Sequence, residues 1–260
     1  MSMVTNNAAW RVEVEPLSTS NGRYEASLAV TGEQVRESQA LRYQVFAEEM
    51  GAQLHSDETG IDKDDLDPWC MHLLVRDTET GRLVGSTRLL DGDSARQFGR
   101  FYSASEFDLS AIEVLPGRKL EVGRTCVHAE FRTGAVIGAL WQGLAELMYR
   151  EQYQWLFGCA SITWEEGGAN VHAIMDRFRR NYLSPANQRV TPRLAVPASV
   201  DGDNLTALRI PPLLKAYVSL GAKICGEPCW DPDFNVADVF VLLEASKLSK
   251  RYVRHFARSE

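Results

Sequence analysis

The sequence has no long apolar run and no signature of secretion. Nowhere among its 260 residues does an apolar stretch approach the roughly 18 residues that a bilayer-spanning helix needs. Residues 1–10 lack a basic segment followed by an apolar core, so we expect no secretory signal. The five cysteines, an odd number without the spacing of a disulfide framework, are typical of a reducing compartment. These absences predict a cytoplasmic protein.

An excess of positive charge is also missing. The formal net charge is −7 at pH 7, which argues against non-specific binding to nucleic acid. Internal repeats and low-complexity tracts are absent, and no set of Cys and His has the spacing of a zinc site. Cys225 and Cys229 are separated by three residues and have no two further ligands, so we predict no metal.

The segment from Lys119 to about residue 161 predicts the centre of the fold. Residues 119–128 alternate like a strand and carry Glu121 and Arg124 near their middle. An apolar helix follows to about residue 150, and residues 155–161 are a second apolar strand. Strand, helix and strand in this order predict a parallel crossover unit.

The remaining patterns predict one α/β domain with a mixed sheet. The expected helices are residues 33–50, 170–182 and 211–220, and the expected strands are residues 24–30, 71–76, 83–90 and 236–243. Residues 91–110 and 184–204 are predicted to be loops. We divide the chain into a polar lead-in (1–32), the domain (33–245) and a basic C-terminal tail (246–260).

Charge is spread unevenly along the chain. Acidic residues gather in residues 48–67, and basic residues gather in residues 176–180 and 247–258. This pattern suggests a cationic ligand and an anionic partner, although solvated surface is the alternative for each run. The apolar residues within the basic tail suit peripheral contact with an anionic inner membrane; an ordinary terminal helix is the competing interpretation.

Four motifs carry a resemblance to a known family. They are Leu41-Arg-Tyr-Gln-Val-Phe46, Asp64-Asp-Leu-Asp67, Gly85-Ser-Thr-Arg-Leu-Leu90 and Glu121-Val-Gly-Arg124. Together they resemble the GNAT-fold acyltransferases that use acyl carrier protein, and most of all the ornithine N-acyltransferases that make lyso-ornithine lipid and the N-acyl amino acid synthases. The resemblance to acyl-homoserine-lactone synthases is weaker.

The resemblance extends from about Gln39 to Leu243 and implies both a fold and a donor. The implied fold is a twisted mixed sheet flanked by helices, splayed between its fourth and fifth strands so that a pantetheine arm can enter. Coenzyme A-dependent relatives carry Gln/Arg-x-x-Gly-x-Gly/Ala, whose backbone N–H groups hold a pyrophosphate. Here Arg132 and Gly134 remain at a spacing shortened by one. This favours an acyl group on the 4′-phosphopantetheine of acyl carrier protein, with no separate cofactor.

Acyl transfer from a thioester to an amine needs the amine unprotonated. Glu121 is our candidate general base, since a carboxylate gains basicity as it loses solvent, and Arg124 joins it as a catalytic residue. The alternative is a Glu121–Arg124 ion pair that stabilises the sheet. Backbone N–H groups near residues 125–127 are the expected donors to the oxyanion, which adds Val127 to the pantetheine site.

The substrate-binding residues follow from the charges of ornithine, which has one carboxylate and two amines. Guanidinium groups suit carboxylate and carbonyl oxygens, and carboxylates attract ammonium groups. We therefore assign substrate binding to Arg42, Glu48, Asp64, Asp67 and Arg88, with Glu49 in place of Glu48 as the alternative. For Glu48, Glu49 and Asp64 taken singly, a solvated acidic face is the favoured interpretation. On the donor side, we expect Arg132, Arg179 and Arg180 to bind the acidic carrier protein.

Cys126 lies on the same predicted strand as Glu121. An acyl-cysteine route through it is conceivable, but a buried structural thiol is the favoured interpretation. His72 is likewise predicted to be a packed or surface histidine.

Three functions therefore compete. The first is transfer of a 3-hydroxyacyl group from acyl carrier protein to the α-amine of ornithine or another amino acid. The second is an acyl-homoserine-lactone synthase that uses S-adenosylmethionine. The third is a catalytically silent module that binds acyl carrier protein or membrane. The sequence alone does not fix the acceptor, the acyl chain length or the oligomeric state.

Overall fold

The computed structural model describes residues 16–20, 22–54, 56–198 and 208–247. The chain forms two compact units, the first from residues 1–100 and 122–152 and the second from residues 101–121 and 153–260. The strand β6 (Arg118–Val127) contributes its beginning to the second unit and its remainder to the first. The predicted basic tail lies outside the described residues from 248 onward.

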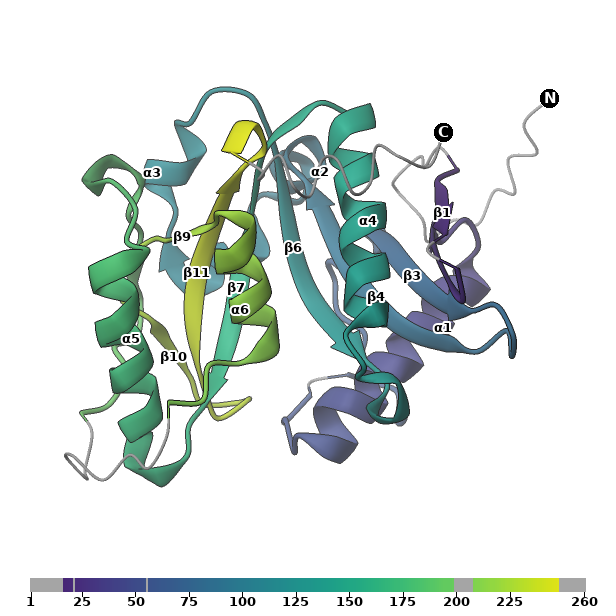
Figure 1. The fold of residues 1–260 in the computed structure, drawn as a ribbon, viewed down its shortest axis with the longest axis horizontal. Coiled ribbons are helices and arrows are strands. Elements are labelled where there is room, and N and C mark those ends of the chain that lie inside the picture. Colours follow the sequence, from purple (N-terminus) through teal and green to yellow (C-terminus); the bar gives the residue numbers. More distant parts are fainter. Residues whose placement is uncertain (1–15, 21, 55, 199–207, 248–260) are drawn as a thin grey trace. The chain divides into compact units, whose positions relative to one another are not determined.

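The first unit is built on an antiparallel meander (Figure 1). Its strands are β1 (Ser18–Ser20), β2 (Tyr24–Leu28), β3 (Met71–Asp77) and β4 (Leu83–Asp91). Each strand pairs with the next, and β3 and β4 form the predicted hairpin with Met71 opposite Leu89. Its helices are α1 (Gly32–Tyr43), α2 (Gly92–Phe98) and α4 (Ala135–Arg150).

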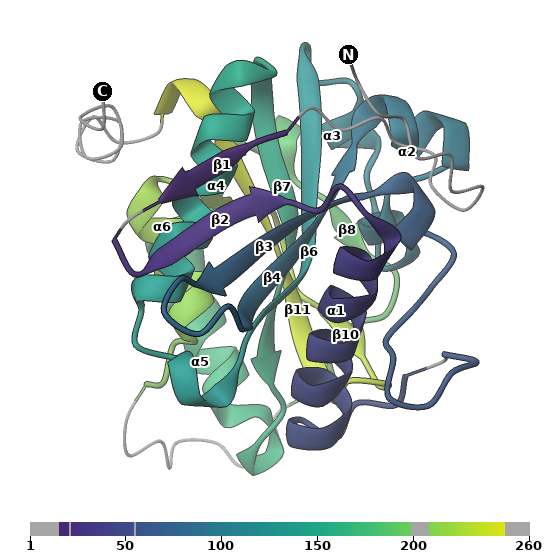
Figure 2. The same ribbon diagram turned by 90° about the vertical axis from the view of Figure 1, so that its right-hand side faces the viewer.

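Helices α1 and α4 cover opposite faces of this meander, as Figure 2 shows. The alternation of a strand explains why. Leu74 packs with Val35 of α1, whereas the neighbouring Leu73 reaches Gly143 of α4, where an added Cβ would lie 3.1 Å from its methyl group. Both leucines are fully buried, so β3 is apolar on both faces.

The predicted helix at residues 33–50 is confirmed, and its last turns are a π-helix. Thr31 caps α1 and forms a capping box with Gln34. The chain then widens into the π-helix Gln44–Glu49, a rare form that is common near functional sites.

The second unit centres on β7 (Tyr153–Thr163) and β11 (Val236–Glu244), which pair antiparallel along their full lengths. The short strands β9 (Lys223–Ile224) and β10 (Cys229–Asp231) pair with β11. Helix α6 (Pro212–Leu220) packs against β7 and β11, and helix α5 (Ala169–Asn181) precedes it in the chain (Figure 1).

Residues 91–110 were predicted to be a loop, and this was wrong, as residues 101–113 show. They form the 3-10 helix η3 (Tyr102–Ser105), β5 (Phe107–Asp108) and α3 (Ser110–Glu113), while α2 occupies much of residues 91–100. β5 pairs with β8 (Thr191–Pro192), within the other predicted loop. An aromatic contact with β11 holds residues 101–113 in place: the ring centroid of Phe107 lies 5.6 Å from that of Phe240.

The crossover from β6 through α4 to β7 is parallel, as predicted. The paired residues of β6 and β7 run only from Arg118 and Tyr153 to Glu121 and Phe157, although β7 continues to Thr163. This early end of pairing is a feature that the predicted splay requires. In the part of the chain that the structure describes, none of the helices combines the length and apolarity needed to cross a membrane.

Candidate functional site

A buried network of charges joins most of the predicted substrate-binding residues in the first unit. The guanidinium group of Arg42 on α1 is fully buried, and it donates to Asp62 and Asp67 at 2.8 Å each. Burial alone would raise the pKa of Asp67, but the charges of Arg42 and Arg88 and a hydrogen bond from Arg42 hold that pKa far below its ordinary value. Asp67 is therefore an anion inside the protein.

Two further arginines complete the network. Arg88 on β4 lies 2.6 Å from Asp64 and 3.1 Å from Asp67. Arg124 on β6 lies 3.3 Å from Asp62. The structure thus brings Arg42, Asp64, Asp67, Arg88 and Arg124 together. Their charges pair largely with one another, and the amide of Gln39 also donates to Asp67 at 3.0 Å. Asp62 is the member that the sequence analysis did not assign, because nothing in its spacing set it apart from the neighbouring acids.

The network joins the acidic segment 62–67 to α1 through Arg42 and to β4 through Arg88. A structural role therefore accounts for most of these side chains. Asp64 and Arg124 are the most accessible members, with side chains 32% and 15% exposed. Arg124 also has a φ of 51°, a left-handed conformation that is unusual for a residue other than glycine. These two residues are where the network can meet a polar ligand. Substrate binding by any member stays a prediction.

Glu48 and His72 differ in burial and in their contact with the network. Glu48 is exposed at the end of the π-helix, and within the described residues no hydrogen bond or ion pair joins it to the network. His72 is fully buried between Ser38 and the carbonyl oxygen of Asp67. Burial lowers its pKa to about 4, so it is neutral at pH 7, and the prediction of a packed histidine is confirmed.

Glu121, the predicted base, lies in the second unit and is held by three donors. The backbone N–H groups of Tyr102 and Ser103 donate to its two oxygens at 2.7 Å, and the Ser103 hydroxyl donates at 2.5 Å. Only 3% of the residue is exposed. Glu121 therefore anchors the start of η3, a role that neither the base prediction nor the ion-pair alternative anticipated. The base role itself stays a prediction.

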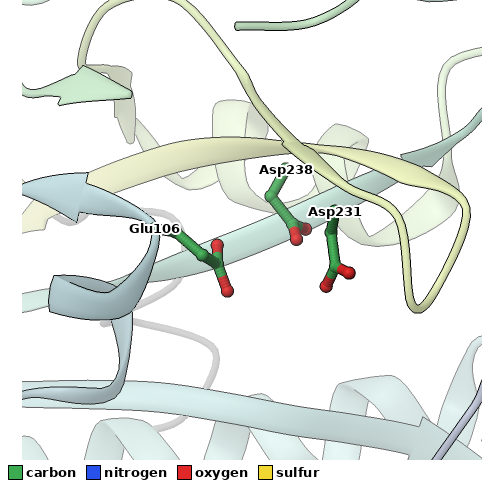
Figure 3. A group of neighbouring side chains, drawn as sticks. All are labelled: Glu106, Asp231 and Asp238. Atoms are coloured by element: carbon green, nitrogen blue, oxygen red, sulfur yellow. The ribbon is translucent and has the colours of Figure 1, made fainter. Parts of the chain in front are cut away.

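A second carboxylate cluster lies at the other end of η3, where Glu106 follows the helix. Figure 3 shows its side chain beside Asp231 of β10 and Asp238 of β11, with carboxylate oxygens within 4.8 Å of one another. Burial first, and then the charge of Asp238, raises the pKa of Glu106 to about 8. Within the described residues, Oε2 of Glu106 has no hydrogen-bond partner. Such a cluster attracts cations, whether metal ions or alkylammonium groups.

This cluster has only a weak signal in the sequence. Asp238 was visible as the single charge in an otherwise apolar strand, and a buried charge of that kind needs a reason. Asp231 lies in the run Asp231-Pro-Asp-Phe-Asn235, near the end of the region that resembles the family. Glu106 had no signal, because it lies in a segment predicted to be a loop.

Ser103 and Cys159 connect the two carboxylate sites. The Ser103 hydroxyl lies 2.5 Å from Glu121 and 3.3 Å from the thiol of Cys159 on β7. Burial, together with the charges of Glu106 and Asp238, raises the pKa of Cys159 well above its ordinary value, so it is a neutral thiol. A continuous polar path therefore runs from Glu121 through Ser103 and Cys159 to Glu106.

On the predicted donor side, Arg132 and Val127 lie together. Nε of Arg132 donates to the carbonyl oxygen of Val127 at 3.1 Å, and the same guanidinium group pairs with Glu49. Gly134, with a φ of 86°, precedes the first residue of α4. Arg132 therefore shapes the turn between β6 and α4.

The two arginines predicted to bind carrier protein differ. Arg179 pairs with Glu227 and Asp176, whereas Arg180 is exposed and has no acidic partner among the described residues. Arg180 is thus the one whose charge remains available for a partner.

Cys126 is a buried thiol, as favoured. It packs with Leu41 and Val45. Burial raises its pKa to about 12, so thiolate chemistry is suppressed at neutral pH.

Comparison with known proteins identifies relatives over almost the whole chain. Residues 41–142 match the family model described as an acetyltransferase (GNAT) domain. The chain is 33% identical to an L-ornithine N(alpha)-acyltransferase of Rhodobacter capsulatus over 250 residues, covering 90% of this chain and 95% of that protein. It is 35% identical to a protein of the same name from Rhizobium meliloti, covering 97% of this chain and 92% of that protein.

Solved structures agree on the fold. A CoA-dependent acyl-homoserine lactone synthase, BjaI, with SAM and isopentyl-CoA, superposes with a TM-score of 0.51 at 14% identity, covering 86% of this chain and 80% of that one. The acyl-homoserine lactone synthase LasI gives 0.50 at 13% identity, covering 87% of this chain and 94% of that one. Together with the GNAT domain match, they confirm the predicted GNAT-like fold, a mixed sheet of mostly antiparallel strands flanked by helices.

Proposed function

Because the chain belongs to the family of L-ornithine N(alpha)-acyltransferases and is an acyltransferase with a GNAT domain, we propose that it acylates the α-amine of L-ornithine. The donor is a 3-hydroxyacyl group on the phosphopantetheine of acyl carrier protein, and the product is lyso-ornithine lipid. The observation that carries the acceptor is the similarity to the named relatives, which spans at least 90% of this chain in both cases.

The reaction makes an amide and breaks a thioester. The α-ammonium group first loses one proton to a base, and the free amine then attacks the thioester carbonyl carbon. The tetrahedral intermediate collapses when the C–S bond breaks, and the pantetheine sulfur leaves as a thiolate. The nitrogen loses its second proton to that thiolate, so one amide, one thiol and one proton are produced. No oxidant, reductant or further cofactor enters this balance.

The first unit carries partly exposed charges of both signs, which suit an amino acid with a net positive charge. Arg124 presents a partly exposed guanidinium group that suits the carboxylate of an amino acid, and Asp64 presents a partly exposed carboxylate that suits an ammonium group. Burial opposes the ionisation of Asp64, but Arg88 and Arg124 hold its pKa below its ordinary value, so it is an anion at neutral pH. The fully buried Arg42 and Asp67 then support this polar surface from behind.

The turn before α4 supports carrier protein over free coenzyme A. A pyrophosphate at a helix N-terminus is commonly held by backbone N–H groups with help from a nearby cation. Arg132 donates from Nε to the carbonyl oxygen of Val127 and pairs with the carboxylate of Glu49, which offsets its positive charge. These contacts hold Arg132 in the turn and weaken its attraction for a pyrophosphate.

The test compares donors and acceptors with the purified protein. Ornithine is supplied with the same 3-hydroxyacyl chain on acyl carrier protein or on coenzyme A, and the product is identified by tandem mass spectrometry, which separates Nα- from Nδ-acylornithine. We expect Nα-acylornithine, formed at least about tenfold faster from the carrier-protein thioester, a preference worth about 1.4 kcal/mol.

Replacing ornithine with other acceptors tests the alternative functions. S-adenosylmethionine in place of ornithine should yield no lactone, and lysine or glycine should react more slowly than ornithine. A lactone product, or equal rates from the coenzyme A thioester, would contradict the acceptor or the donor respectively.

A further inference from the structure

We propose that Glu106, rather than Glu121, takes the proton from the α-ammonium group of the acceptor. This inference rests on the proposed acyl transfer to an amine and assigns a catalytic residue within it. Three observations support this inference: the hydrogen bonds that Glu121 receives, the charged groups around Glu106, and the contact of Glu106 with β7 beyond the point where β6 pairs with it.

Glu121 is poorly suited to accept a proton. Its carboxylate already receives three hydrogen bonds, two from backbone N–H groups and one from Ser103, at 2.5–2.7 Å. Hydrogen bonds donated to the charged form stabilise that form and weaken its basicity. Protonation of Glu121 would weaken these bonds, through which it holds Tyr102 and Ser103 at the start of η3.

Glu106 has the opposite surroundings. Asp238 on β11 and Asp231 on β10 place two more carboxylates beside it, so its negative charge is disfavoured (Figure 3). Its other neighbours are the neutral thiol of Cys159 on β7 and the phenol of Tyr102 on η3, whose hydrogen bonds only partly offset this effect. Oε2 is buried and has no hydrogen-bond partner within the described residues.

A charged residue near the main chain of Glu106 does not alter this picture. The backbone N–H group of Arg193 donates to the carbonyl oxygen of Glu106 at 2.7 Å, and its Nε donates to the carbonyl oxygen of Ala104 at 2.8 Å. The net effect of all these groups raises the pKa of Glu106 to about 8. A base works best when its pKa is close to the working pH, and an ordinary carboxylate is far too acidic to deprotonate an ammonium group.

The position along β7 also fits the reaction. Pairing between β6 and β7 ends at Glu121 and Phe157, and Cys159 is two residues further along β7, on the same face as Phe157. Glu106 therefore lies beside the part of β7 that has left its β6 partner. An acceptor whose ammonium group enters the carboxylate cluster is attracted there by charge, and its arrival favours the ionised form of Glu106 that removes the proton.

The proton balance is simple. One N–H bond of the ammonium group breaks and one O–H bond forms on Oε2 of Glu106. The resulting amine attacks the thioester, and the proton on Glu106 leaves to solvent after the product departs. The path through Cys159 and Ser103 joins Glu106 to Glu121 by contacts that include a 3.3 Å Ser103–Cys159 distance.

The experiment is Glu106→Gln, which keeps the shape and removes the proton acceptor. With ornithine we expect kcat/KM to fall by about 10²–10⁴-fold. In the parent protein kcat/KM should rise as the pH approaches 8, and the variant should lose this rise. With hydroxylamine, a nucleophile that is unprotonated at neutral pH, the same variant should remain within a few-fold of the parent. A purely structural role would reduce both reactions equally.

Three variants complete the design. Asp233→Asn removes an exposed carboxylate from the turn that follows β10 and should leave both reactions unchanged. Glu121→Gln should lower the rate but retain the rise of kcat/KM toward pH 8, because it disturbs η3 and not the base. If Glu106→Gln does not fold, Glu106→Asp retains a carboxylate and should show an intermediate rate, with this rise shifted along the pH axis.

The outcomes separate this inference from the function it rests on. If the parent protein forms no acyl-ornithine, the proposed function fails. If the parent is active and Glu106→Gln is as active with ornithine, or is equally impaired with hydroxylamine, the assignment of Glu106 fails alone.

Discussion

The guanidinium group of Arg42 is wholly buried in the first unit. Ion pairs with Asp62 and Asp67 offset the free energy lost when this charge leaves water. Breaking a buried ion pair by removing one partner is expensive, because the remaining charge is left uncompensated. We therefore expect Arg42→Met to lower the free energy of unfolding by about 3–5 kcal/mol. Chemical denaturation measures this directly.

The same helix provides a matched control. Arg36 on α1 pairs with Glu58 at the surface, where both side chains are largely exposed. Arg36→Met should have no measurable effect on stability, since solvent screens the pair. Equal effects of the two substitutions would show that the buried network does not stabilise the first unit.

His72 makes the stability of the first unit depend on pH. Its pKa falls from 6.5 to about 4 on folding, so the unfolded chain binds a proton at a higher pH than the folded protein does. The stability that comes from the neutral histidine is complete above pH 6.5 and is lost as the pH falls toward 4. Asp67, with its depressed pKa, adds a further loss only below its ordinary pKa of 3.8.

The prediction is that His72→Gln flattens the curve of unfolding free energy against pH between 6.5 and 4. Denaturant midpoints at several pH values measure the slope. An unchanged slope in the variant would assign the pH dependence to other groups. Glu106 acts in the opposite sense, since its raised pKa makes stability fall as the pH rises from 4.5 toward 8.

Single residues show how far sequence reasoning reaches. Of the residues assigned to substrate binding, Glu48 stays outside the network, whereas the arginines and the two aspartates meet in space, because buried charges must find partners. Their partners were not predictable, because an acidic run offers several equivalent carboxylates and only the folded loop selects Asp62, Asp64 and Asp67. Glu106 was invisible, since nothing local distinguishes it from a surface glutamate.

At the scale of elements, a glycine in a motif of the resemblance has a packing reason. An added Cβ at Gly85 on β4 would lie 2.6 Å from the Cγ1 of Val136 on α4. Valine is stiff at χ1 and cannot move aside cheaply. Gly85→Ala should therefore cost about 1–3 kcal/mol of stability by overpacking, measured by denaturation.

Gly123 on β6 is the control for Gly85. An added Cβ there would meet no atom within 4 Å, and the residue has no positive φ. Gly123→Ala should leave stability unchanged or slightly raised. A comparable loss at both positions would mean that strand flexibility, and not the close approach of α4, explains the glycines.

Helix α5 carries the prediction for carrier-protein binding. Arg180 is exposed, whereas Arg179 is held by Glu227, whose pKa is lowered by that contact. Arg180→Glu should raise the KM for acyl carrier protein several-fold at low salt, with kcat retained, because exposed charges mainly steer encounter.

Salt and a neighbouring substitution provide the controls. The difference between Arg180→Glu and the parent should shrink as ionic strength rises. Arg179→Gln should disturb the ion pair with Glu227 more than it affects encounter. Unchanged kinetics for Arg180→Glu at every salt concentration would exclude this face of α5 as the docking surface.

At the scale of the whole molecule, strong periodicity predicted the long elements well. The helices and strands at residues 33–50, 71–90, 119–161 and 236–243 are present with the expected order and pairing. The errors fell on residues 91–110 and on the described residues 184–198 of the other predicted loop, where short elements are selected by tertiary contacts such as the ring contact of Phe107 with Phe240. Local pattern carries little information about such segments.

The direct test of the central claim is mass spectrometry of lipids from cells that overproduce the protein. The account predicts a new lipid in which a 3-hydroxyacyl chain is joined by an amide to the α-nitrogen of ornithine, and its loss in cells that produce the Glu106→Gln variant. A lactone, an amide of another amino acid, or no new amide in cells that contain the folded parent protein would contradict it.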